Sequence, residues 1–250
     1  MRIVDLTQDT KQDLLGTLLK RSPNNYGSYE KTVAEIVGDV RARGDEALCE
    51  YTERFDHCHL TSDAMRVTRA EIEEAYTQVD EEFIRVLKNS AANIRAYHEK
   101  QLRTSWFDAK PDGTILGQRI MPLATAGIYV PGGKAAYPSS LLMNAVTARV
   151  AGVPRILICT PPGQDGKIVP VTLVAADVCG IDEIYKCGGA QAIAAMAFGT
   201  ETIPKVEKIT GPGNIFVALA KKAVFGYVSI DSIAGPSEIL VLADESANPR

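Results

Sequence analysis

The stretch AGIYVPGGKAAYPSSLLMNAVTARVAGVPRILICT, residues 126–160, decides the fold class of this chain. It opens with a short apolar run that ends in a glycine loop. A segment of helical spacing follows, and the stretch closes on a second apolar run. Short apolar runs of this kind are typical of buried strands. A strand, a helix and a second strand form the unit from which parallel sheets are built. The stretch therefore predicts one such unit.

The same alternation continues toward the C-terminus. Apolar runs recur about every 20–30 residues, the size of a strand-helix-strand unit, and segments of helical spacing lie between them. The sequence therefore predicts an α/β fold with helices on both faces of a mostly parallel sheet. The expected strands are 127–130, 155–159, 183–187, 207–210, 228–230 and 238–242, and the expected helices are 140–151, 170–179, 191–198 and 214–225.

The residues before 126 have a different character, because they are rich in charge and their apolar spacing predicts helices. Thr68 followed by Glu71 has the pattern of a capping box at a helix start. Two short apolar segments flank Asp112-Gly113, a pair that is typical of a hairpin turn. This half is therefore expected to be helical and to carry one β-hairpin. The expected helices are 29–43, 45–55 and 81–102.

Length and composition exclude several classes of protein. The chain has 250 residues, a formal net charge of −4 and 46% hydrophobic residues, which are the proportions of a globular protein. The acidic balance argues against nucleic-acid binding, and no apolar run approaches the ~18–20 residues of a membrane span. The N-terminus is unlike a signal peptide, and the five cysteines include no CxxC pair. These features favour a cytoplasmic protein with reduced thiols.

Four glycine-containing loops follow predicted strands. Ligands of an open parallel sheet bind at that edge, where glycine lets a backbone approach a phosphate and helix N-termini offer free N–H groups. Neither GxGxxG nor a Walker A motif occurs, so the loops predict only a dinucleotide or phosphorylated ligand. Tyr129 ends the first strand beside such a loop, a position that suits a core residue and a site residue equally. The loops are PGGK (131–134), CGGAQ (187–191), TGPGN (210–214) and AGPSE (234–238).

The segment His57-Cys58-His59 contains residue types that bind metals. A zinc site usually has four ligands, and no second ligand cluster occurs in the sequence. A solvated loop is therefore the favoured interpretation of this segment. The two lysines at 221 and 222 lie in the last turns of a predicted helix, where cations suit the helix dipole, and they predict a solvated face.

Cys159 and Cys187 end predicted strands near the same edge of the sheet. Either thiol is a candidate nucleophile, and an aldehyde-dehydrogenase-like enzyme would need one. No histidine lies nearby in the sequence to activate them, and buried cysteine is the commoner situation for a residue in a strand. Two buried, unreactive thiols are therefore the favoured interpretation.

Longer motifs around the loops carry a resemblance to a known family. GIYVPGGKAAYPSSLLMNA, GGAQAIAAMAFGTETIP, KITGPGN and DSIAGPSEILVLAD occur in this order and closely resemble L-histidinol dehydrogenase. The resemblance implies a zinc-dependent, NAD-linked enzyme. It oxidises L-histidinol to L-histidine through histidinaldehyde, in the last steps of histidine biosynthesis. The resemblance also implies that Tyr129, Gln191 and Asn214 contact NAD and that Ser237 contacts the substrate.

The family's layout implies how the chain is divided. It predicts an N-terminal helical arm over 1–25 and a first α/β domain over 26–125 that residues 238–250 continue. A Rossmann-like NAD-binding domain over 126–237 is inserted into that first domain, and the run 238–244 is expected to return to it as a strand. The family's fold is an atypical Rossmann-like one, which accounts for the missing GxGxxG motif. The full-length form is expected to be a homodimer.

Family members run well beyond Arg250. In them, later segments supply the zinc ligands and a Glu-His pair that handles protons, and this chain contains no counterpart of either. No catalytic residue and no metal ligand is therefore assigned within the chain, which resembles the N-terminal portion of the enzyme. We expect the 250-residue chain to be inactive by itself. The alternative is a truncated, non-catalytic NAD-binding paralogue.

Overall fold

The fold is described from a computed structural model of the chain. The structure describes residues 5, 7–19, 26–132, 136–233, 239 and 241–248. Its contacts divide the chain into two compact units. One unit comprises Met1–Gly27 and Ala234–Arg250 and contains helix α1 (Gln8–Leu19). The other comprises Ser28–Ile233 and contains every strand of the described residues.

A five-stranded sheet forms the centre of the larger unit, and all its neighbouring strands are parallel. The strand order is β5-β4-β3-β6-β7. The chain therefore builds the sheet outward from β3 in one direction and then crosses to the other side of β3. The strands are β3 (Thr125–Tyr129), β4 (Arg155–Thr160), β5 (Glu183–Lys186), β6 (Lys208–Thr210) and β7 (Ser229–Ile230).

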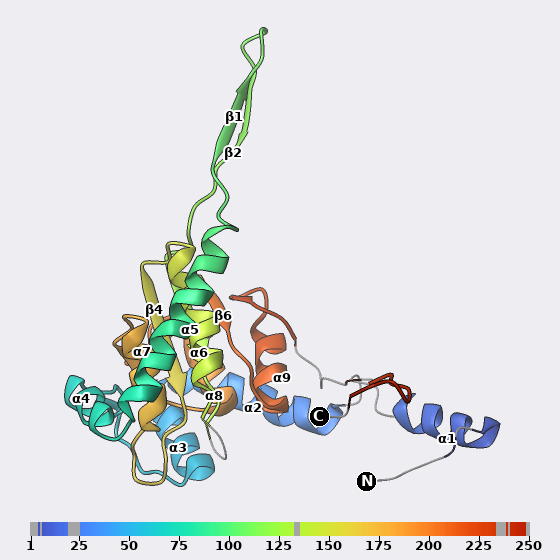
Figure 1. The fold of residues 1–250 in the computed structure, drawn as a ribbon. Coiled ribbons are helices and arrows are strands. Elements are labelled where there is room, and N and C mark those ends of the chain that lie inside the picture. Colours follow the sequence, from blue (N-terminus) through green and yellow to red (C-terminus); the bar gives the residue numbers. More distant parts are fainter. Residues whose placement is uncertain are drawn as a thin grey trace. The chain divides into compact units, whose positions relative to one another are not determined.

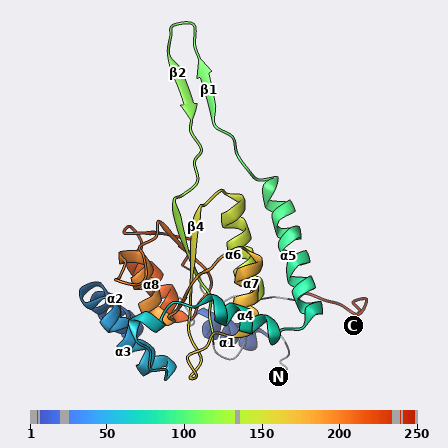
Figure 2. The same ribbon diagram turned by 90° about the vertical axis from the view of Figure 1, so that its left-hand side faces the viewer.

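Two layers of helices cover the sheet, as the strand-helix alternation predicts. Helices α4, α5, α6 and α7 pack on one another, while α3 packs on α8 and α8 on α9. Figure 2 shows α5, α6 and α7 on one side of β4 and α2, α3 and α8 on the other. The bounds are α2 (Gly27–Arg43), α3 (Asp45–Asp56), α4 (Arg69–Thr77), α5 (Glu81–Glu99), α6 (Pro138–Val150), α7 (Pro170–Val178), α8 (Gly189–Phe198) and α9 (Ile215–Val224).

The core lies between the sheet and these layers. Ile128, Ile158 and Ile184, from three adjacent strands, are almost completely buried, as expected of parallel strands covered on both faces. The predicted capping box is confirmed, because Glu71 N donates to Thr68 Oγ1 at 3.3 Å and Thr68 N donates to the Glu71 carboxylate at 2.8 Å. These local signals fix where the elements begin, and burial of the apolar runs fixes how they stack.

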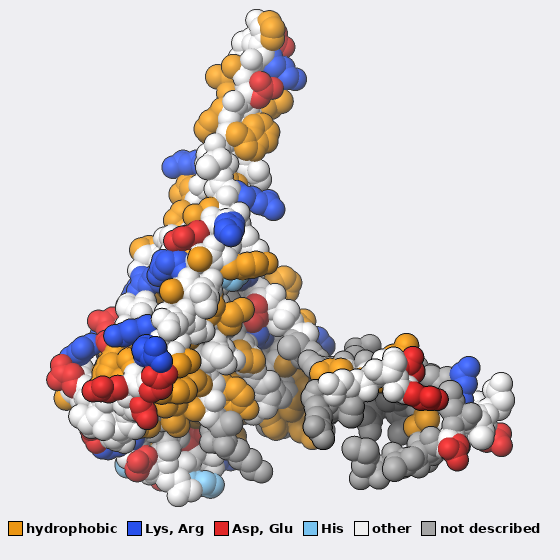
Figure 3. Space-filling model, viewed as in Figure 1, with side chains coloured by type: hydrophobic (Ala, Val, Ile, Leu, Met, Phe, Trp, Pro, Cys, Tyr) orange, Lys and Arg blue, Asp and Glu red, His pale blue; other side chains and the backbone are white. Residues whose placement is uncertain are grey.

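The predicted hairpin is confirmed and projects beyond the end of α5 (Figures 1 and 2). Strand β1 (Trp106–Ala109) pairs antiparallel with β2 (Ile115–Gln118). Both faces are exposed although they carry large apolar side chains, among them Phe107 and Leu116. Figure 3 shows hydrophobic side chains along the side of the hairpin that faces the viewer. Because an isolated two-stranded hairpin is marginally stable in water, these side chains are expected to pack against a partner.

The expected strand over 238–244 is not formed in the part of it that the structure describes. Residues 239 and 241–244 have no regular secondary structure. The side chains of Ile239, Val241 and Leu242 are almost fully exposed. Apolar alternation supports a strand only where a neighbouring strand takes its backbone hydrogen bonds, and none pairs with these residues. The division of the larger unit into two domains stays a prediction.

Within the described ranges, no helix has both the length and the apolar character needed to cross a membrane.

Candidate functional site

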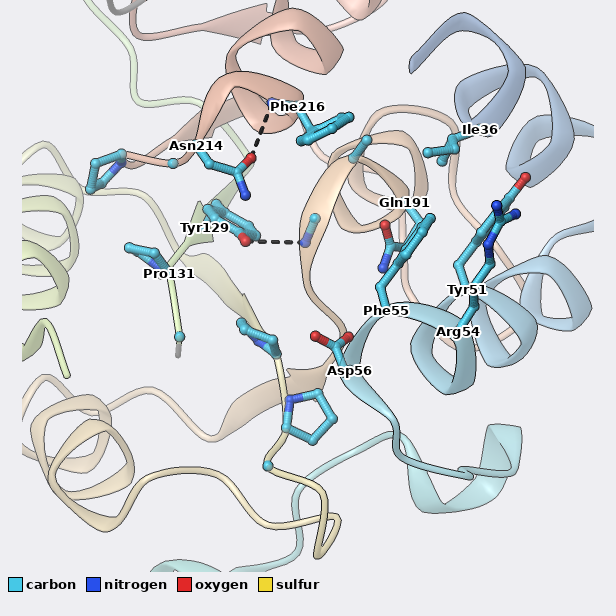
Figure 4. A pocket seen from close by; sticks show the side chains of 18 of the residues that line it. Ile36, Tyr51, Arg54, Phe55, Asp56, Tyr129, Pro131, Gln191, Asn214 and Phe216 are labelled. Carbon is cyan, nitrogen blue, oxygen red and sulfur yellow. Dashed lines mark hydrogen bonds between the residues drawn. The ribbon is translucent and has the colours of Figure 1, made fainter. Parts of the chain in front are cut away.

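A cavity of about 1130 Å³ lies at the carboxyl ends of the parallel strands (Figure 4). The chain leaves β3 for α6 on one face of the sheet and leaves the adjacent β6 for α9 on the other. Parallel sheets bind ligands at such a switch point. The volume exceeds the ~300–1,000 Å³ that is usual for small-molecule pockets. Residues from the sheet edge that line it include Tyr129, Pro131, Gly132, Pro161, Gly189, Gln191, Pro212 and Asn214.

Tyr129 ends β3 with its ring buried and its hydroxyl at the cavity. The hydroxyl oxygen accepts a hydrogen bond from Gly189 N at 3.1 Å, which leaves its own proton available to a ligand. Burial raises the pKa of the Tyr129 phenol well above its ordinary value, so the hydroxyl remains a donor at neutral pH. The two interpretations of this residue are therefore compatible, since the ring belongs to the core and the hydroxyl to the cavity wall.

Gln191 lies in the first turn of α8 and is 1% exposed. Its Oε1 is buried and accepts no hydrogen bond from any residue that the structure describes. Gly189 lies beside it with φ +64°, and a Cβ there would lie 2.6 Å from Oε1. Glycine at 189 therefore provides both the left-handed backbone and the space for the amide. An unpaired buried acceptor costs about 1–3 kcal/mol, which a ligand donor would recover.

Asn214 is the N-cap of α9. Its Oδ1 accepts hydrogen bonds from Phe216 N at 3.0 Å and from Val217 N at 3.2 Å. The side-chain oxygen is thus committed to the helix, and the Nδ2 amide remains as a donor at the cavity (Figure 4). The predicted residues Tyr129, Gln191 and Asn214 thus line one cavity, which fits their strand-end positions. Their roles as NAD contacts stay predictions.

The loop before Asn214 is held by an ion pair between the buried Lys221 and the partly exposed Asp231. Asp231 Oδ2 accepts from Gly211 N at 2.9 Å, and Lys221 Nζ donates to Gly211 O at 2.9 Å and pairs with the Asp231 carboxylate. Gly211 has φ +117°, and a Cβ there would collide with the carbonyl oxygen of Tyr129. The prediction of a solvated face is therefore wrong for Lys221, which is buried. It holds for Lys222, which is exposed and pairs with Glu30.

Sequence reasoning missed Asp56, the last residue of α3, which lines the same cavity. Its Oδ2 is buried and, among the described residues, has no hydrogen-bond partner. Burial raises the pKa of the Asp56 carboxyl to about 6, and the charge of the adjacent His57 acts in the opposite direction. The sequence carried no signal for Asp56, because it lies between the predicted helix 45–55 and the segment His57-Cys58-His59, which favours a solvated loop. Nothing local indicated that α3 covers the strand ends.

Other predicted positions lie elsewhere. Ser237 and the rest of the AGPSE loop lie outside the described residues. Cys159 and Cys187 are completely buried, and burial raises the pKa of both thiols, so they are not activated nucleophiles. His59 Nδ1 lies 3.2 Å from a Glu53 carboxylate oxygen on the surface. No group of three or more His, Cys, Asp or Glu side chains that suits a metal ion occurs within the ranges that the structure covers.

The sheet, its strand order and the cavity at its switch point define a doubly wound, Rossmann-like α/β protein. The sequence model of the family described as histidinol dehydrogenase matches residues 19–250. The chain therefore belongs to the histidinol dehydrogenase family of oxidoreductases.

Individual relatives agree with the family match. The chain is 59% identical over 233 residues to a histidinol dehydrogenase of Bacillus subtilis (strain 168), covering 92% of this chain and 54% of the relative. It is 52% identical over 251 residues to a histidinol dehydrogenase of Clostridium acetobutylicum, and the match covers 99% of this chain and 58% of the relative. A crystal structure of histidinol dehydrogenase from Elizabethkingia anophelis matches with a TM-score of 0.82 and 38% sequence identity. The match covers 100% of this chain and 53% of the chain in that structure. The chain spans about half the length of the curated relatives it matches.

Proposed function

We propose that this chain provides the NAD-binding part of a histidinol dehydrogenase. That enzyme oxidises L-histidinol to L-histidine through histidinaldehyde, in the last steps of histidine biosynthesis. Membership of the family supports the reaction, and the cavity supports the cofactor. The observation that carries the proposal is the buried, unpaired Oε1 of Gln191 in the same cavity as Tyr129 and Asn214.

The residues of the cavity fit NAD. The Tyr129 hydroxyl and the Asn214 Nδ2 offer donors, and the Gln191 Oε1 offers an acceptor to a hydroxyl or a carboxamide N–H. Helices α8 and α9 begin at the cavity, where their first N–H groups and their dipoles favour the anionic pyrophosphate. When bound, NAD supplies the hydride acceptor. The side chains of this chain position it and exclude water from around it.

The described residues do not fit a zinc ion, because they contain no cluster of three suitable ligands. No catalytic step is therefore derived through zinc on this chain. The family resemblance supports a zinc site and a proton-handling Glu-His pair in the complete enzyme. We propose that the 250-residue chain by itself does not oxidise histidinol. General-base catalysis alone contributes about 10²–10⁴-fold, so its loss leaves little activity.

The buried, unpaired Oε1 of Gln191 in the cavity also favours one alternative, a non-catalytic paralogue that binds NAD without turnover. The test is NADH formation from L-histidinol and NAD with added zinc, followed by absorbance. We expect NADH from the protein expressed from its complete gene and none from residues 1–250 alone. Activity of residues 1–250 alone would overturn the proposed dependence on further residues. NAD binding without NADH formation by the complete gene product would establish the alternative.

We further propose that the protein is a homodimer in the cytoplasm. The exposed apolar side chains on both faces of the hairpin support a protein partner for it. All five cysteines are free thiols in the structure, which is typical of a reducing compartment.

A further inference from the structure

One wall of the cavity comes from α3, far in the sequence from the glycine loops, and carries a carboxylate that the contacts described above do not use. Figure 4 shows the Asp56 side chain directed into the cavity. The buried Oδ2 accepts no hydrogen bond from the described part of the chain, and the same is true of Gln191 Oε1. The cavity thus holds two buried acceptors without donors. A ligand that fills it well must bring several donors.

An aromatic surface lies beside this carboxylate. Phe55 precedes Asp56, lines the same cavity and is 45% exposed. Its ring stacks on Tyr51, with ring centroids 5.6 Å apart and an interplanar angle of 7°. A flat apolar surface next to an acceptor suits an adenosine, whose base stacks and whose ribose presents two neighbouring hydroxyl donors. The α3 wall therefore has the chemistry of an adenosine subsite.

We propose that the Asp56 carboxylate accepts hydrogen bonds from the 2′- and 3′-hydroxyls of the adenosine ribose and so selects NAD over NADP. This inference rests on the proposed binding of NAD in the cavity. An ionised carboxylate only accepts hydrogen bonds, so it suits a diol. A 2′-phosphate in the same place would bring a second anion against it.

The charges around Asp56 favour this selection. Glu35 also lines the cavity and adds negative charge to it. Arg54 is the cation that the described part of this wall offers to a phosphate. Its guanidinium carbon lies 5.3 Å from the centroid of the Phe55 ring, within the ~6 Å of a cation–π contact. Burial raises the pKa of the Asp56 carboxyl to about 6, so the group is ionised at pH 7.5. Asp56→Asn therefore removes the repulsion and leaves Arg54 in place.

The test titrates NAD and NADP into the protein, expressed from its complete gene, by calorimetry at pH 7.5. We expect the wild type to bind NAD at least tenfold more tightly than NADP. In Asp56→Asn that ratio should fall at least tenfold, and Asp56→Ser should shift it in the same direction. Asp182→Asn is the matched control, because Asp182 is an exposed acid outside the cavity, and its ratio should equal that of the wild type.

Thermal unfolding shows whether each variant is folded. We expect Asp56→Asn without ligand to melt above the wild type, because it no longer buries an unpaired charge. A wild type that binds NAD, together with an unchanged NAD:NADP ratio in both Asp56 variants, would overturn this inference and leave the proposed function intact. A wild type that binds neither dinucleotide would overturn both.

Discussion

Lys221 reaches back from α9 to the carbonyl oxygen of Gly211, and its Nζ donates to that oxygen at 2.9 Å. Asp231, which follows β7, accepts from the N–H of the same glycine and pairs with the lysine. The two side chains thus hold both backbone groups of Gly211. This fixes the loop that presents Asn214 to the cavity, at the place where Gly211 lies against the backbone of Tyr129.

Lys221→Met is therefore expected to lower the free energy of unfolding by about 1–3 kcal/mol, because Gly211 O and the partly exposed Asp231 carboxylate lose their charged hydrogen-bond donor. NAD affinity should fall as well, because the loop loses its support. Lys222→Met is the matched control, and its exposed pair with Glu30 should contribute about 0–1 kcal/mol. Chemical denaturation measures the free energy of unfolding of both variants. Equal free energies of unfolding for the two variants would show that the Lys221–Asp231 pair does not hold the loop.

Asp56→Asn should make stability less dependent on pH. The pKa of the folded Asp56 carboxyl is about 6, against an ordinary value of 3.8. The folded state therefore holds this proton more tightly, and stability is lost as pH rises from about 3.8 to 6. After allowance for solvent screening of this partly exposed group, the variant should gain about 1–2 kcal/mol at pH 7 and little at pH 4. Denaturation at the two pH values measures this, and an equal gain at both would contradict the raised pKa.

Asn214→Asp should separate the two roles of this side chain. Asp caps helices as well as Asn does, because either side-chain oxygen accepts from Phe216 N and Val217 N. The stability of the variant should equal that of the wild type. The Nδ2 donor is lost and an anion faces the cofactor, so NAD affinity should fall at least about tenfold, or ~1.4 kcal/mol. Asn214→Ala should lose both the helix cap and the Nδ2 donor, and loss of the cap should lower the free energy of unfolding by about 1 kcal/mol. Unchanged affinity in Asn214→Asp would remove Nδ2 from the site.

The hairpin provides a test of self-association. Phe107 and Ile115 share one of its exposed faces by the observed register. The double variant Phe107→Ser, Ile115→Ser should lower the mass of the native protein from dimer toward monomer, measured by sedimentation. Asp108→Ser, a polar change on the opposite face, should leave the mass unchanged. A dimeric double variant would place the interface elsewhere.

Local patterns predicted the five strands of the sheet, the helices that cover it and the hairpin, because each depends on neighbours in the sequence. The strand expected over 238–244 is not formed in its described residues. Tyr129 and Gln191 were placed correctly at one sheet edge, since the carboxyl ends of parallel strands always share it. The position of α3 was not predictable in this way. Its N-terminus is anchored to the loop after α8, where Thr202 N donates to the Asp45 carboxylate at 3.3 Å and Asp45 N donates to Glu201 Oε2 at 2.9 Å.

These long-range contacts bring Asp56 over the cavity, and no periodicity in the chain indicates them. The burial of Lys221 escaped prediction for the same reason. Helical spacing places it in the last turns of α9, but only the folded sheet brings Asp231 to it. Burial of an ionisable side chain depends on partners that sequence patterns do not reveal.

The most direct test of the central claim is the affinity of NAD for the wild type and for Gln191→Ala, measured by calorimetry on the protein expressed from its complete gene. Gln191 Oε1 is the buried acceptor for which a ligand donor is proposed. Its removal should weaken NAD binding by about 1–3 kcal/mol without loss of stability. Gln118→Ala, on the exposed hairpin, should bind NAD as the wild type does. Equal NAD affinity in the wild type and Gln191→Ala would contradict the account.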